Sequence, residues 1–102
     1  MTSTAAFISE LIRAANEIDR LEKHERVGLL KRASAQIRDM RDQIGMSGAP
    51  ANDNDPEDIA SELNGMAEVP EVFIPREIAA KLLEGAEAIR TLAILLGIKD
   101  EV

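Results

Sequence analysis

Apolar residues recur along the first part of the chain with the spacing of a helix. Between residues 4 and 21 they are separated alternately by three and four positions, which places them along one side of an α-helix. The same alternation returns from Leu30 to Ile44, but the second apolar face is rotated by about a quarter of a turn from the first. The pattern predicts one long or kinked helix over residues 4–44, with a break near residues 22–25 as the alternative.

The middle of the chain changes composition. Residues 45–55 are rich in Gly, Ala, Asn and Asp, which is typical of turns, and we expect a flexible acidic linker there. An Asp-Pro pair and two further acids follow, as at the start of many helices. The sequence therefore predicts a short acidic helix over 56–64, with Asn64-Gly65 as its stop.

Two prolines define the region after this helix. Proline disfavours helical geometry in the residue before it, so we expect an extended segment over 66–75, with Pro70 inside it and Pro75 at its end. Pro75 is also well placed to open a helix. Regular apolar spacing after it predicts a last helix over 75–97, ended by Gly97.

The kinds of apolar residue favour helices over a sheet. The chain has no Trp or Tyr, and its only aromatic residues are Phe7 and Phe73. The core must therefore be built largely from Leu, Ile and Ala, which pack well between helices. The sequence predicts one all-α domain over 1–102. Its expected architecture is an antiparallel helical hairpin with coiled-coil spacing, in which the long N-terminal helix packs on the C-terminal helix.

Charge is distributed unevenly along the chain. The formal net charge is −7, and all of it comes from the second half, because residues 1–44 contain eight basic and seven acidic side chains. Such a division suggests that the two halves attract each other or that each faces a different partner. On a continuous first helix, six basic residues would fall within an arc of about 80°. This basic ridge comprises Arg13, Arg20, Lys23, Lys31, Arg38 and Arg41.

The basic ridge allows two interpretations. A solvated helix face or a docking site for an acidic segment fits the acids that lie between the basic residues. A ligand-binding or nucleic-acid-binding surface is the alternative. The acidic total and the lack of stacking aromatic residues argue against nucleic acid.

The sequence offers little catalytic or metal-binding chemistry. Acids alternate over residues 53–58 as at the start of a calcium loop, but the sixth position is Asp58 instead of Gly and the twelfth is Asn64 instead of Glu. His24 is the only histidine, and its neighbours are typical of a solvated helix. There is no cysteine, nucleophile motif or phosphate-binding glycine loop. We therefore expect no enzymatic activity, no metal site and no cofactor.

Two regions carry more apolar surface than a hairpin can bury. The end of the last helix is apolar on more than one face, which predicts a homodimer, with coverage by the folded-back segment 66–75 as the alternative. The candidate interface residues are Leu83, Leu92, Leu95, Leu96 and Ile98. The second region is the segment between the prolines, which can complete the core or serve as a docking strip for a protein with a basic surface. Its candidate residues are Val69, Val72, Phe73 and Ile74.

The last helix also carries a family resemblance. The run Ala88-Ile89-Arg90-Thr91-Leu92-Ala93-Ile94-Leu95-Leu96-Gly97 resembles the C-terminal helix of the TraM antiactivators. These are small, dimeric, helical proteins that sequester a transcription factor, and the resemblance implies a function of that class. The resemblance is confined to this run.

Composition and resemblance together suggest a non-enzymatic regulatory or adaptor protein that acts by protein–protein contact. An inhibitor that sequesters its partner is one example of that class. The longest apolar run is too short to span a membrane, and the N-terminus lacks the basic start and long apolar run of a signal peptide. We therefore expect a cytoplasmic protein with no membrane contact.

Overall fold

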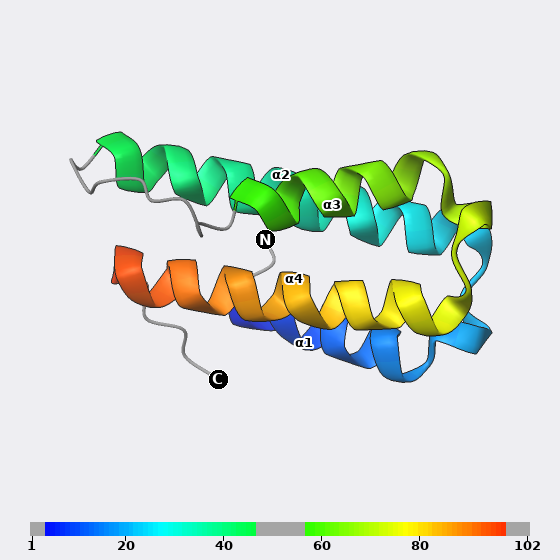
Figure 1. Ribbon diagram of the computed structural model, residues 1–102. Helices are drawn as coiled ribbons and strands as arrows, with labels where there is room; N and C mark the ends of the chain where they lie inside the picture. Colours follow the sequence, from blue (N-terminus) through cyan, green and yellow to red (C-terminus); the bar gives the residue numbers. More distant parts are fainter. Residues whose placement is uncertain (1–3, 47–56, 98–102) are drawn as a thin grey trace.

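The computed structural model describes residues 4–46 and 57–97. In these ranges it contains four α-helices, two short 3₁₀ turns and no strand, so the predicted all-α fold is confirmed (Figure 1). The α-helices are α1 (Thr4–Asn16), α2 (Lys23–Met46), α3 (Glu57–Glu68) and α4 (Pro75–Leu96). The 3₁₀ turns are η1 (Ile18–Arg20), between α1 and α2, and η2 (Pro70–Val72), between α3 and α4.

Successive helices run in opposite directions and form two layers (Figure 1). In one layer α2 lies beside α3, and in the other α1 lies beside α4. The helix α4 packs against all three of the others, whereas the backbones of α1 and α2 lie farther apart and these helices meet through side chains such as Arg32 and Phe7. The inward face of α4 is therefore the surface that α1, α2 and α3 have in common.

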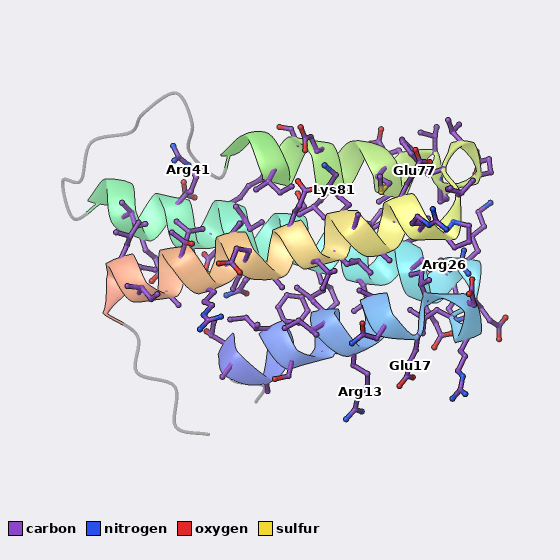
Figure 2. The ribbon with its side chains drawn as sticks, turned by 60° about the horizontal axis from the view of Figure 1, so that its bottom comes forward. Arg13, Glu17, Arg26, Arg41, Glu77 and Lys81 are labelled. Carbon is purple, nitrogen blue, oxygen red and sulfur yellow. The ribbon has the colours of Figure 1, made fainter. Side chains whose placement is uncertain are left out.

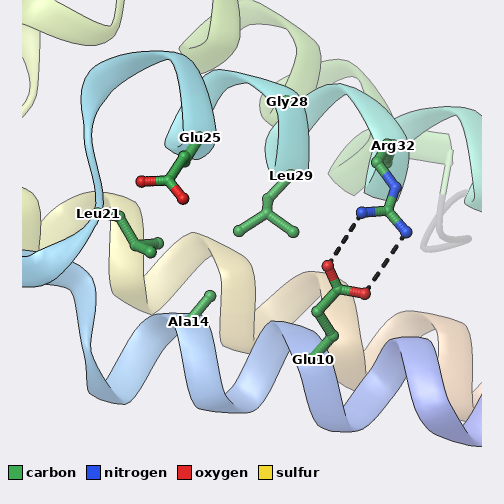
Figure 3. Close-up of a pocket in the computed structure, with 7 residues that line it drawn as sticks. All are labelled: Glu10, Ala14, Leu21, Glu25, Gly28, Leu29 and Arg32. Carbon is green, nitrogen blue, oxygen red and sulfur yellow. Dashed lines mark hydrogen bonds and ion pairs between the residues drawn. The ribbon is translucent and has the colours of Figure 1, made fainter.

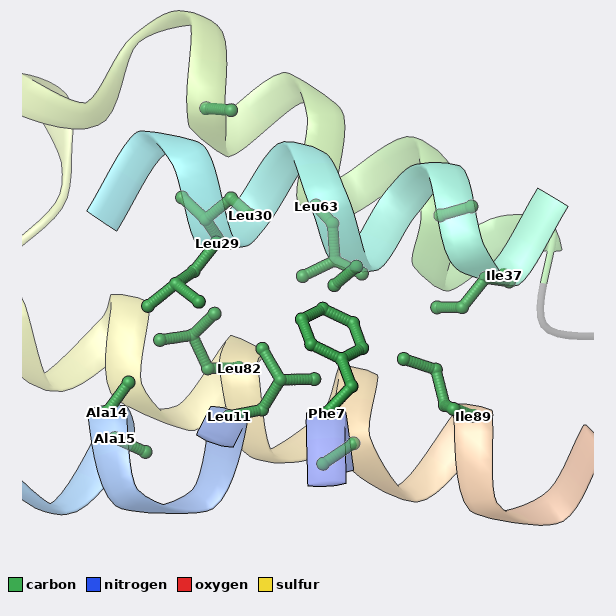
Figure 4. Close-up of a cluster of buried hydrophobic side chains, with 14 of the residues drawn as sticks. Phe7, Leu11, Ala14, Ala15, Leu29, Leu30, Ile37, Leu63, Leu82 and Ile89 are labelled. Carbon is green, nitrogen blue, oxygen red and sulfur yellow. The ribbon is translucent and has the colours of Figure 1, made fainter. Parts of the chain in front are cut away.

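The core consists of aliphatic side chains and the ring of Phe7, which converge between the two layers (Figure 4). Its fully buried members include Leu11, Leu30, Ile37, Leu63, Leu82 and Ile89. Gly85 lies on the buried face of α4, where a Cβ atom would be 3.3 Å from Cδ1 of Leu63 and 3.7 Å from Cβ of Ala33. The absence of a side chain at Gly85 thus lets α4 approach α2 and α3 closely.

The prediction of one continuous or kinked helix over 4–44 is wrong, and the alternative of a break is confirmed, a few residues before the expected 22–25. The chain leaves helical geometry after Asn16, forms η1 and reverses direction before α2 starts at Lys23. A continuous helix of this length would be about 60 Å long, whereas the longest principal extent of the molecule is 39 Å. The break lets both apolar stripes, although rotated relative to each other, face the same helix α4.

Two hydrogen bonds stabilise the reversal between α1 and α2. The backbone N–H of Glu22 donates to Oε1 of Glu25 over 2.9 Å, which caps the start of α2. Arg26 lies one turn into α2, and its Nη2 donates to the backbone oxygen of Ile18 over 2.8 Å. The first bond satisfies a backbone N–H that the helix break would otherwise leave free, and the second ties α2 to the backbone of η1. The charged run that looked helical in the sequence therefore contains the residues that hold the turn.

The short helix is also longer than predicted, because α3 continues through Asn64-Gly65 to Glu68. Gly costs about 1 kcal/mol relative to Ala inside a helix. The added turn buries Met66 and Ala67 against the core, and this burial offsets that cost. The extended segment predicted over 66–75 is accordingly wrong over its first three residues.

The rest of that segment is partly as predicted. Pro70 begins the 3₁₀ turn η2 instead of an extended stretch, and its ring is buried. Phe73 and Ile74 have extended backbone geometry, as expected immediately before Pro75. The last helix is confirmed: α4 begins at Pro75, and Gly97 ends it in the left-handed conformation with φ of 72°.

A bulky residue at Gly85 should separate the helices. We expect Gly85→Leu to lower the free energy of unfolding by about 1–3 kcal/mol, because its side chain must displace Leu63 and push α4 from α2. The matched control is Gly65→Leu in α3, where the position of an added Cβ atom has no neighbouring atom within 4 Å. That change should leave stability equal or slightly higher, since Leu is the better helix former. Urea denaturation measures both, and equal effects at the two sites would contradict the close approach.

Lys81 connects α3 to α4 and should make stability fall at alkaline pH. Its side chain is 19% exposed, and Nζ lies 2.7 Å from Oε1 of Glu62 and 3.3 Å from Oε1 of Glu84. Burial lowers the pKa of Lys81, but the bonds to both carboxylates outweigh it, so the net pKa is raised above 10.5. A group whose pKa is higher in the folded than in the unfolded state stabilises the folded protein at pH values below the unfolded-state pKa. This stabilisation is lost as the pH rises through the folded-state pKa.

We therefore expect wild-type stability to decrease more steeply above about pH 10.4 than that of Lys81→Met. Denaturant unfolding at a series of pH values measures the difference. Lys31→Met, at an exposed position of α2, is the control and should retain the wild-type slope. Identical slopes for Lys81→Met and wild type would show that Lys81 does not couple folding to pH.

Candidate functional site

The basic ridge does not exist as one surface, because the continuous helix on which it depended does not form. Arg13 lies on α1, Arg20 lies in η1, and the other four residues lie on α2. Arg13 projects from one side of the bundle and Arg41 from the opposite side (Figure 2). The four residues on α2 still share an arc of about 80° along that helix, but they form a shorter stripe than the sequence suggested.

Lys23, one member of the predicted ridge, is engaged with the acidic half of the chain. Its Nζ lies 3.3 Å from Oε1 of Glu71 in η2, and both side chains are largely exposed. A hydrogen bond from the backbone of Glu71 itself, and then the ammonium group of Lys23, lower the pKa of the Glu71 carboxyl. This ion pair is one attraction between the two halves of the kind that the charge division predicts.

An open groove lies between α1 and α2, whose backbones are not in close contact (Figure 3). Its volume is about 280 Å³, and its lining residues are Glu10, Ala14, Leu21, Glu25, Gly28, Leu29 and Arg32. Arg32 crosses the groove: Nη1 donates to Oε2 of Glu10 over 3.0 Å and Nη2 donates to Oε1 over 3.5 Å. The same guanidinium lies 4.7 Å from the centre of the Phe7 ring.

The polar side chains of the groove already have hydrogen-bond partners within the chain. Glu10 pairs with Arg32, and Glu25 accepts the hydrogen bond from the backbone of Glu22. A free acid and base facing each other, as proton transfer requires, are therefore not found among the groove residues. The apolar part, formed by Ala14, Leu21 and Leu29, can accept a small apolar group, while the ion pair closes one end.

The groove could not be predicted from the sequence, because it results from the helix break. The only sign of that break in the sequence is the quarter-turn rotation between the two apolar stripes. When the chain reverses between them, both stripes can face the core. The other chemical candidates add little. No group of three or more His, Asp or Glu side chains in the described ranges could hold a metal ion. His24 is exposed at the start of α2, and the acids at 53 and 55 lie outside the described residues.

The predicted docking strip is divided by the structure. Phe73 is half-buried and packs against the core, as the core interpretation requires. Val72 and Ile74, on either side of it, are 69% and 57% exposed, and Val69 is 43% exposed. Each of the two interpretations therefore fits different residues: Phe73 anchors the segment, and its neighbours present apolar surface to solvent.

The candidate dimer residues also separate into two groups. Leu92 is 1% exposed, so it belongs to the core of the single chain and cannot reach a second copy in this fold. Leu96 is half-buried against the same core, and Ile98 lies outside the described residues. Leu83 and Leu95 are 44% and 67% exposed. The outward face of α4 thus supplies the accessible candidates, and its most exposed apolar side chain is Ile94.

Comparison with known protein families, with curated proteins and with solved structures finds no significant match to the chain. The short resemblance in α4 therefore stands without support from a wider similarity. In the described parts of the chain, no helix is both long enough and apolar enough to cross a membrane.

Phe73 and Val72 should respond differently to truncation. Phe73→Ala removes a half-buried ring from the core, so its cost should exceed about 1 kcal/mol but stay below the roughly 3–5 kcal/mol of a fully buried Phe. Val72→Ala, at an exposed position, should change stability by no more than about 0.5 kcal/mol. Urea denaturation distinguishes them. A Phe73→Ala protein as stable as wild type would mean that Phe73 does not anchor the segment.

Proposed function

We propose that the protein is a small non-enzymatic regulatory or adaptor protein that acts by contact with another protein, as a homodimer. The observation that supports this function best is the apolar turn between α3 and α4. Val69, Val72 and Ile74 are 43%, 69% and 57% exposed within six residues. A cluster of large apolar side chains on a short connection is more typical of an interaction site than scattered surface residues are.

The backbone that carries these side chains is fixed at several points. The ring of Pro70 is buried, Phe73 packs on the core, and the backbone N–H of Ile74 donates to Oε1 of Glu77 over 3.0 Å. Lys23 holds the turn to the start of α2 through Glu71. A surface held in one conformation loses little entropy when a partner binds, which favours affinity.

The charges around the apolar turn suggest which partner surface fits. Glu68, Glu71 and Glu77 are exposed beside it, and only Glu71 has a basic partner among the described residues. Apolar contacts would supply affinity, and the acids would favour a partner with basic groups at the rim of its binding surface. A regulator that sequesters such a protein is the form of this function that we favour.

The alternatives are less well supported. An enzymatic role finds no support in the α1–α2 groove, because its carboxylates are already engaged in an ion pair and a helix cap. Nucleic-acid binding through the basic ridge loses its main basis, because the ridge is divided among α1, η1 and α2. The net charge of −7 also opposes binding to a polyanion.

Affinity capture with matched variants tests the function. The bait is the tagged protein, applied to extract of its native host, and the variant Val72→Asp/Ile74→Asp places two charges in the apolar turn. The control Ser9→Asp/Ala35→Asp adds the same charge at exposed positions of α1 and α2. We expect wild type and control to capture the same protein, and the turn variant to recover at least about tenfold less of it.

Two results would overturn this function. Equal capture by both variants would remove the apolar turn as the docking site. Retention of nucleic acid at low salt, with a steep loss as salt rises, would favour the basic surface instead. Circular dichroism and thermal melting of each variant confirm that the comparison is made between folded proteins.

A further inference from the structure

The outward face of α4 carries a second pattern, separate from its buried face. Leu83, Glu87, Arg90 and Ile94 follow one another at intervals of four, three and four residues, the spacing of a coiled-coil seam. All four side chains are exposed, with Leu83 at 44% and Ile94 at 71%. They therefore form a stripe along the side of α4 that none of α1, α2 and α3 covers.

The stripe is self-complementary when it is read in the opposite direction. Its order is apolar, acidic, basic, apolar, and the spacing is symmetric about its middle. In an antiparallel pair of such helices, the register that places Leu83 opposite Ile94 of a second copy also places Glu87 opposite that copy's Arg90. A twofold interface requires this kind of self-complementarity, because each residue meets a different residue of the same surface.

The two charges of the stripe, Glu87 and Arg90, are unpaired within the described parts of the single chain. Glu87 and Arg90 form no ion pair or hydrogen bond with another described residue, although they lie one turn apart on α4. Three other basic residues, Lys23, Arg32 and Lys81, each pair with a carboxylate of another element. The antiparallel register would give each free charge of the stripe a partner of opposite sign.

The ends of the stripe also suit a second helix. One turn before Leu83 lies Ala80, and one turn after Ile94 lies Gly97, so the same register pairs two small residues and lets the helices approach. The seam from Ala80 to Gly97 is about 25 Å long.

We infer that α4 pairs with α4 of a second copy in antiparallel orientation, through Leu83–Ile94 contacts around two Glu87–Arg90 ion pairs. The inference rests on the proposed homodimer and gives it a location, which moves the interface from the apolar end of α4 to its outward face. Val72 and Ile74 precede α4 and lie outside the seam. In an antiparallel dimer the two apolar turns are therefore free and lie at opposite ends, so that one dimer offers two docking sites.

Charge exchange provides the sharpest test. Arg90→Glu places acids opposite acids across the seam, and Glu87→Arg places bases opposite bases. We expect each single variant to raise the dimer dissociation constant, measured by sedimentation equilibrium, at least about tenfold. The double variant Glu87→Arg/Arg90→Glu restores opposite charges and should dimerise as wild type does. A mixture of the two single variants should form a heterodimer, because their charges complement each other.

Apolar variants locate the interface on α4. Leu83→Glu and Ile94→Glu should abolish the dimer at micromolar concentration, whereas Leu95→Glu should leave it intact. Leu95 is the matched control, because it is 67% exposed on the same helix but about 100° away from Ile94. All of these positions are exposed, so circular dichroism should show folded proteins throughout.

The outcomes separate this inference from the proposed function. A wild-type protein that is monomeric at about 100 μM and still captures its partner would overturn the seam and the proposed homodimer, but not the adaptor function. Loss of the dimer in Leu95→Glu, with no effect of the charge variants, would also overturn it and return the interface to the end of α4. A dimer that responds to charge exchange as expected but captures no protein would support the seam and overturn the adaptor function.

Discussion

The contact that the fold depends on most is the packing of the inward face of α4 against three other helices. With two Phe residues as the only aromatic side chains, the chain must gain its burial from many small contacts, and these require helices that lie close together. Gly85 allows this close approach, because it has no side chain where α4 meets Leu63 and Ala33. The consequence is a division of α4 into an inward face that holds the bundle and an outward face that is left for other contacts.

The break between α1 and α2 follows from the same constraint. Both apolar stripes of the first half must reach α4, and a straight helix cannot bring them there. Arg26 bonds to the backbone of Ile18 at the turn, and Arg32 bridges to Glu10 farther along, so two arginines hold helices whose backbones do not pack together. The groove between α1 and α2 thus forms because two rotated apolar stripes pack onto one helix. Its polar side chains form the hydrogen bonds and the ion pair that stabilise this arrangement.

The polar surface shows a similar division of roles. Lys23, Arg32 and Lys81 each connect two elements through a carboxylate, and exposed pairs of this kind contribute modestly to stability while fixing how elements meet. The charges of Glu87 and Arg90, by contrast, remain unpaired within the described parts of the chain. The apolar turn and the outward face of α4 both carry large apolar side chains that the fold leaves exposed.

The sequence alone determined the helical class, the start of α4 at Pro75 and its end at Gly97, because these features depend on local periodicity and on backbone preferences of single residues. It could not decide between a continuous and a broken first helix, since residues 17–25 are good helix formers and the turn is stabilised by side chains such as Arg26 acting over eight residues. It also ended α3 too early at Gly65, where burial of Met66 and Ala67 outweighs local propensity.

The same distinction applies to the candidate surfaces. The apolar excess of α4 was visible in the sequence, but only tertiary packing showed that Leu92 is buried and that Leu83 and Ile94 are not. Likewise, the pattern of Val72, Phe73 and Ile74 could not show which side chain faces the core. Apolar periodicity reports that a residue can be buried, whereas the positions of neighbouring helices decide whether it is, and that decision depends on contacts between residues far apart in the chain.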